Sequence, residues 1–150
     1  MVDFVIRPAT RQDFSEIRTL IHAVYINPTG LDWRRFLVAM TPENTFLGCG
    51  QIKPHSDGSL ELASIAVQED ARGQGVARAI IQALLERETT RPLYLMCRAS
   101  LELLYIKFGF HAIGPEDMPV YFKRISRAER IFNANARAED RLMIMRILGS

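Results

Sequence analysis

Cysteine, tryptophan and lysine are scarce in this chain of 150 residues. The two cysteines, Cys49 and Cys97, exclude a disulfide-dense scaffold, and we expect both to stay reduced inside strands. Together with three histidines they show no metal-ligand spacing, so no metal site is expected. We interpret Cys97 as a small buried hydrophobe.

Long apolar runs are also missing. No stretch of about 18 uninterrupted apolar residues occurs, so we expect no membrane-spanning helix. The first four residues lack the charged start and apolar block of a signal peptide, which favours a cytoplasmic protein. Apolar residues make up 48% of the chain and no linker interrupts it, so residues 1–150 are predicted to form one folded domain.

A strong charge of one sign is absent as well, since the net charge is +2. Basic residues are concentrated near the end of the chain, where residues 118–150 hold 7 basic and 3 acidic side chains. A nucleic-acid binder usually shows a denser basic stripe with interleaved aromatic residues, so no nucleic-acid partner is expected. We interpret residues 123–141 as a solvated helix, and their role stays open.

The feature that is present, and that says most about function, is a glycine-bearing turn. Residues 72–77 read RGQGVA and lie between an apolar run at residues 60–67 and a helical stretch that begins at Gly75. The first amides of a helix have no internal partner and lie in positive potential, so this order suits a pyrophosphate. A P-loop is excluded because no Lys-Ser or Lys-Thr pair follows. The Rossmann fingerprint G-x-G-x-x-G is excluded because Arg78 stands where the third glycine is required.

The pattern that fits is [RQ]-x-x-G-x-[GA], read at Arg72, Gly75 and Ala77. It resembles the acetyl-CoA pyrophosphate loop of the GNAT superfamily of N-acetyltransferases. A second resemblance follows in residues 100–110, which read SLELLYIKFGF and match the family pattern L-Y-x-x-x-G-F from Leu104 to Phe110. The two motifs occur in the family order with one strand between them, and the resemblance extends over about residues 2–122.

The resemblance implies an α/β (α+β) GNAT fold, in which a mixed, mostly antiparallel twisted sheet of six to seven strands is flanked by about four helices. Hydrophobic periodicity and turn residues place these elements. Strands are expected at residues 2–7, 35–40, 45–53, 60–67, 93–97, from 110, and 142–148. Helices are expected after Thr10, with a buried stripe at Phe14, Ile17, Ile21 and Val24, and at residues 75–88, 100–108 and 126–135.

The family also implies an activity, which is transfer of an acetyl group from acetyl-CoA to a primary amine by direct attack. Tyr105 matches the tyrosine that often serves as general acid toward the coenzyme A sulfur. The residues expected to hold acetyl-CoA, which is the co-substrate, are Ile65, Ala66, Val67, Arg72, Gly73, Gln74, Gly75, Val76 and Ala77. The residues expected near the acceptor amine are Tyr25, Asn27, Leu31 and Trp33.

The general base is harder to assign. Glu61 stands at the start of the strand that leads into the glycine loop, where some family members place a catalytic glutamate. A glutamate is equally typical of an exposed strand start, so the identity of the base stays open. His22, His55 and His111 are not placed by the sequence as a base.

Two functions therefore stand as hypotheses. The first is an N-acetyltransferase acting on an unidentified small-molecule amine, with a homodimer as the default assembly. The alternative is a non-catalytic acyl-CoA-binding regulatory module, which would keep the loop and lack a base.

Overall fold

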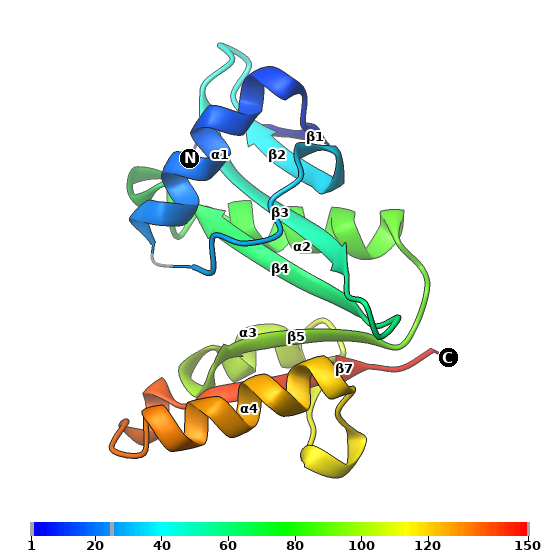
Figure 1. Cartoon of the computed structure of the whole chain (residues 1–150). Coiled ribbons are helices and arrows are strands. Elements are labelled where there is room, and N and C mark those ends of the chain that lie inside the picture. The colour runs from blue at the N-terminus through cyan, green and yellow to red at the C-terminus, as the bar shows by residue number, and fades with distance from the viewer. Residues whose placement is uncertain (1, 25, 150) are drawn as a thin grey trace. The chain divides into compact units, whose positions relative to one another are not determined.

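A computed structural model describes residues 2–24 and 26–149 of the chain. These residues form two compact units, which are described separately. The first unit comprises residues 1–53 and 62–89, and the second comprises residues 54–61 and 90–150. Seven strands and four α-helices are present in the described part of the chain, in the numbers expected from the sequence (Figure 1).

The first unit is built on strands in the order β1-β2-β3-β4. Their bounds are Val5–Pro8, Phe36–Met40, Phe46–Pro54 and Leu60–Val67. The pairs β1–β2 and β2–β3 are antiparallel, with Ile6 opposite Ala39 and Val38 opposite Cys49. The hairpin end between β3 and β4, residues 54–61, belongs to the second unit.

Helix α1, Phe14–Ala23, and helix α2, Val76–Arg87, cover the two faces of this sheet (Figure 1). On α1 the buried residues are Ile17, Leu20 and Ile21, which pack against the inward side chains of β2 and β3. The predicted buried stripe included Phe14 and omitted Leu20. The structure corrects both points, because Leu20 is buried and Phe14 is only half-buried. A buried helical stripe is two adjacent rows wide, so Leu20 three residues after Ile17 lies inside it, while Phe14 begins the helix and is half-buried.

The second unit holds antiparallel strands in the order β5-β7-β6. Strand β5 is Leu93–Arg98, β6 is His111–Ala112 and β7 is Leu142–Ile147. Helix α4, Val120–Phe132, packs on this sheet by inserting Phe122 against Tyr94 and Ile144. The predicted helix at residues 126–135 was therefore placed too late, because Pro119 fixes its start and Phe122 anchors its first turn.

Helix α3, Glu102–Ile106, is shorter than the predicted helix at residues 100–108. A 3-10 turn, Ala99–Leu101, replaces its first residues. Gly109 stops the helix with a φ of +101°, a left-handed conformation that glycine adopts without strain. This requirement explains the glycine of the second motif.

One ion pair joins the first strand to the first helix. Arg7 donates from Nη1 to Oδ2 of the buried Asp13 at 2.8 Å, and the Thr10 backbone N–H donates to the same oxygen. Thr10 stands directly before the 3-10 turn Arg11–Asp13, which leads into α1. The hydrogen bond from Arg7 is the largest cause of the lowered pKa of Asp13, ahead of the opposing effect of burial.

We predict that Asp13→Asn lowers the free energy of unfolding by about 2 kcal/mol at neutral pH, because a buried charge-assisted hydrogen bond is lost. The folded-state pKa of Asp13 is lowered, so its contribution is present above its ordinary value of about 3.9 and is lost as the pH falls through the folded-state pKa. Urea denaturation at pH 7 and in acid measures both effects. The exposed Asp3→Asn is the control, and equal stabilities of the two variants at pH 7 would contradict the prediction.

Candidate active site

The glycine turn lies between β4 and α2 in the first unit. After β4 ends at Val67, a 3-10 turn, Glu69–Ala71, leads into residues 72–75. Gly73 and Gly75 have φ values of +75° and +83°, which side chains rarely adopt. A Cβ built on either glycine would meet nothing within 4 Å, so the turn is open on the side where these hydrogens point.

The start of α2 directs its backbone amides into this turn. Gly75 is the residue before the helix, and the first bond of the helix runs from the Ala79 N–H to the Gly75 carbonyl at 3.0 Å. The earlier amides have no partner within the helix, and the helix dipole adds positive potential at the same point. The turn can therefore bind an anion such as a pyrophosphate.

Two side chains of the turn form hydrogen bonds with the backbone of the protein and stabilise the turn. The Arg72 Nε donates to the Val67 carbonyl at 3.1 Å, which ties the turn back to the end of β4. Gln74 accepts a hydrogen bond from the Val2 backbone N–H through Oε1 at 2.7 Å. The backbone, more than these side chains, is what the turn offers to a ligand.

Strand β4 is distorted just before the predicted contacts at Ile65, Ala66 and Val67. Ser64 has a φ of +60°, which is uncommon for a residue with a side chain and costs about 1 kcal/mol or more. The regular alternation of buried and less buried residues fails here, since residues 61–64 are all buried. Such a break in the strand redirects the backbone groups next to it.

In the second unit, the hairpin between β3 and β4 brings His55 and Glu61 together. His55 Nε2 lies 2.7 Å from Glu61 Oε1, and the two side chains are 11% and 4% exposed. The turn itself is closed by the His55 N–H bonding to the Ser59 carbonyl at 2.9 Å. Glu61 is therefore buried, and the alternative interpretation of an exposed glutamate at a strand start is wrong.

The sequence did not place His55 as a base. The sequence feature that could have identified His55 is its spacing from Glu61 across a short turn. A hairpin places two residues with this spacing as diagonal neighbours on one face. An ionised Glu61 can only accept, so His55 Nε2 is then the donor in this hydrogen bond. The pair can hold or move a proton.

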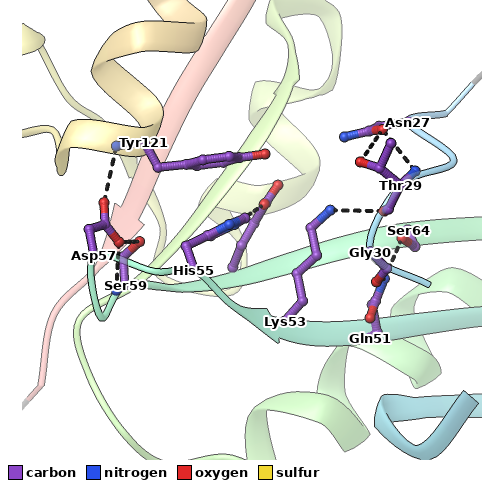
Figure 2. Close-up of polar contacts among 11 residues, drawn as sticks. Asn27, Thr29, Gly30, Gln51, Lys53, His55, Asp57, Ser59, Ser64 and Tyr121 are labelled. Carbon is purple, nitrogen blue, oxygen red and sulfur yellow. Dashed lines mark hydrogen bonds and ion pairs between the residues drawn. The ribbon is translucent and has the colours of Figure 1, made fainter. Parts of the chain in front are cut away.

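Tyr121 packs on the same histidine. Its ring lies over the imidazole (Figure 2). The two rings are stacked, with centroids 3.6 Å apart and an interplanar angle of 18°. The Tyr121 backbone N–H donates to Asp57 Oδ2 at 3.0 Å, which fixes the start of α4 to the hairpin. Burial, followed by the charge of Glu61, raises the pKa of the Tyr121 hydroxyl, so it stays protonated at neutral pH.

Tyr105 lies on α3 and is buried. Burial raises its pKa to about 12, with a smaller contribution from Cys97. The ring meets Phe110 edge to face at 6.2 Å, and the carbonyl of Tyr105 accepts the N–H of Phe110. Tyr105 is thus a protonated donor held in place by the second motif.

Neither cysteine has the environment of a nucleophile. Burial raises the pKa of Cys97 to about 11, with a further contribution from Glu102, and burial raises the pKa of Cys49 to about 12. Both are free thiols. Because the thiolate is the reactive form, both side chains act as small buried hydrophobes, in agreement with the sequence.

The residues predicted near the acceptor lie in and beside the loop between α1 and β2. Asn27 Oδ1 accepts from the backbone and hydroxyl of Thr29, which shapes the loop. Leu31 packs against the core of the first unit, and Trp33 begins a 3-10 turn, Trp33–Arg35, with the Arg34 guanidinium 5.1 Å from its ring. Tyr25 lies outside the described residues.

Two searches of the described residues, 2–24 and 26–149, gave negative results. No group of three or more His, Cys, Asp or Glu side chains is arranged to hold a metal ion. No helix in the same part of the chain has the length and apolar character needed to cross a membrane.

Comparisons with known proteins agree with the two motifs. The family model described as an acetyltransferase (GNAT) domain matches residues 32–112. No curated protein sequence matches the chain. Several solved structures share its fold at low sequence identity, and three of them are described next.

A Mycobacterium tuberculosis protein complexed with coenzyme A aligns with a TM-score of 0.72 and 19% identity, over 96% of this chain and 98% of that one. N-acetylglutamate synthase from Neisseria gonorrhoeae, complexed with coenzyme A and L-arginine, gives a TM-score of 0.74 and 15% identity. That alignment covers 99% of this chain, which spans only 34% of the synthase. A GNAT-family acetyltransferase from Staphylococcus aureus gives a TM-score of 0.69 and 12% identity, over 99% of this chain and 100% of that one.

The structural matches confirm the predicted GNAT fold. The family model covers more than half of the sequence, including the glycine turn, the His55–Glu61 hairpin and Tyr105. This chain therefore belongs to the GNAT family of acetyltransferases, and it is an acyltransferase.

Proposed function

We propose that this protein transfers the acetyl group of acetyl-CoA to the primary amine of a small molecule, by direct attack of the neutral amine on the thioester. The observation that carries the proposal is the open turn formed by Gly73 and Gly75 at the start of α2. Coenzyme A in the structures of two similar proteins supports acetyl-CoA as the co-substrate. In this proposal residues 1–150 act as one acetyltransferase domain.

The amine must lose a proton before it attacks, because an ammonium group has no lone pair. We assign this step to Glu61, with His55 as the residue that positions its carboxylate through the 2.7 Å hydrogen bond. The low exposure of Glu61 favours transfer through a water molecule. Binding of acyl-CoA alone does not require a carboxylate–histidine pair, so the pair favours the enzyme over a non-catalytic acyl-CoA-binding module.

The thiolate of coenzyme A must be stabilised as it leaves. We assign this role to the Tyr105 hydroxyl, whose pKa of about 12 lies above that of an ordinary thiol, about 8.5. Complete proton transfer from Tyr105 to the sulfur is therefore uphill. Tyr105 acts in this proposal mainly by donating a hydrogen bond to the developing negative charge.

The first prediction concerns acetyl-CoA binding. Gly75→Asp should abolish binding in a calorimetric titration, because it adds a negative charge where the pyrophosphate would lie. Gly58→Asp is a matched control, since Gly58 has a similar φ of +88° and open space around it but lies in the β3–β4 hairpin. Equal acetyl-CoA affinity in the two variants would refute the assignment of the loop.

The second prediction concerns the base. Glu61→Gln should lower kcat by about 10²–10⁴-fold, the usual contribution of a general base. The acidic limb of the wild-type pH–rate profile should disappear in the variant, because that limb reports protonation of the general base. His55→Gln should lower kcat less than Glu61→Gln. An intact acidic limb in Glu61→Gln would assign the base to another group.

The third prediction concerns the leaving group. Tyr105→Phe should lower kcat by about 10²–10³-fold, as expected when one donor to a developing charge is removed. Acetyl-CoA affinity, measured by calorimetry, should be unchanged. Unchanged turnover in a thiol-release assay would reduce Tyr105 to a packing residue.

A further inference from the structure

A group of buried polar side chains joins strand β3 to the loop between α1 and β2, entirely within the first unit. Gln51 and Lys53 on β3 donate to the carbonyls of Gly30 and Thr29, respectively, and Gln51 also donates to the Ser64 hydroxyl on β4 (Figure 2). Gln51 and Lys53 are two residues apart on a strand, so their side chains project from the same face. The loop is the one that we predicted to lie near the acceptor.

Gln51 leaves one polar atom without a partner. Its Nε2 donates to the Ser64 hydroxyl at 2.9 Å and to the Gly30 carbonyl at 3.3 Å. A carbonyl can only accept, so the amide nitrogen must face Gly30, and this fixes the orientation of the side chain. The opposite atom, Oε1, is buried and has no hydrogen-bond partner among residues 2–24 and 26–149, in a residue that is fully buried.

Lys53 is a buried ammonium with few partners. The residue is 5% exposed, and its Nζ donates to the Thr29 carbonyl at 3.5 Å, which is long for a hydrogen bond. None of the ion pairs within residues 2–24 and 26–149 includes Lys53. The side chain runs along Gly30, where an added Cβ would lie 3.6 Å from both its Cδ and its Nζ.

These two groups are costly for the fold by themselves. A buried charge is usually paired, and a buried acceptor is usually hydrogen-bonded. An apolar residue of the same length at position 53 would avoid the loss of hydration that an ammonium suffers on burial. Their arrangement is therefore better explained by a ligand that completes both sets of contacts.

We propose that Lys53 and Gln51 form a subsite for the acceptor, and that the acceptor is a primary amine that carries a carboxylate, as an amino acid does. The carboxylate would bind the Lys53 ammonium, and an N–H group of the same molecule would donate to Gln51 Oε1. This inference rests on the proposed acetyltransferase function and names the substrate class of that enzyme.

The test compares free α-amino acids with the carboxamides of the same amino acids, in a thiol-release assay with acetyl-CoA. A carboxamide lowers the basicity of the neighbouring amine, so more of it is in the reactive neutral form and the intrinsic chemical bias favours the carboxamide. The wild type should nevertheless show a kcat/KM at least tenfold higher for the preferred amino acid than for its carboxamide. That ratio corresponds to one charge-assisted hydrogen bond.

The variant Lys53→Met should abolish this ratio by raising KM for the free acid, while the carboxamide reacts nearly as before. Lys123→Met removes a lysine that is exposed on α4 and should keep the wild-type ratio. A lysine that only supports the fold would lower kcat/KM for both members of each pair equally. Calorimetric titration of the same pairs into the protein saturated with coenzyme A gives the same comparison without turnover.

The outcomes separate this inference from the function on which it rests. If the wild type binds acetyl-CoA but neither binds nor acetylates free acids better than carboxamides, the subsite is wrong and the acetyltransferase proposal stands. An equal effect of Lys53→Met on acids and carboxamides would also overturn the subsite. If acetyl-CoA does not bind at all, the proposed function fails, and this inference fails with it.

Discussion

The left-handed backbone at Gly75 is the constraint on which the proposed chemistry depends. A φ of +83° lets the chain reverse from β4 into α2 while the first amides of the helix stay unpaired within it. Any residue with a Cβ would strain this turn, and a negatively charged one would also repel the pyrophosphate that we propose to bind there. The Arg72 bond to Val67 and the Gln74 bond to Val2 hold the turn in the same position.

The His55–Glu61 pair shows how a short hairpin can bring the proposed base and its partner together. The turn closes through its own backbone bonds, so two side chains that are six residues apart meet at 2.7 Å. Tyr121 covers the imidazole, and its backbone is in turn held by Asp57, whose pKa is lowered by hydrogen bonds that outweigh the opposing effect of burial. Because water is largely excluded from the pair, its electrostatic interactions are stronger than they would be on the surface.

Several features of this chain make sense as adaptations for function more than for stability. In the part of the chain that the structure describes, Lys53 is buried without an ion pair and Gln51 has an unpartnered oxygen, while Ser64 has a left-handed backbone. Each is unfavourable in an isolated fold, and such features concentrate where a protein binds or transforms a ligand. The core clusters around Ile17 and Phe122 supply the packing that tolerates them.

Local patterns in the sequence determined the family, the number and order of the elements, the glycine turn and the position of Tyr105, because these depend on residue spacing along one stretch of chain. The same patterns misplaced the start of α4, which is set by the insertion of Phe122 into the second sheet. They also did not identify His55 as part of a site, because its role depends on Glu61, which the hairpin places beside it. Only the tertiary structure decided which polar residues are buried together, because burial is a property of the packed chain. The sequence of a single strand shows only the alternation of its polar and apolar residues.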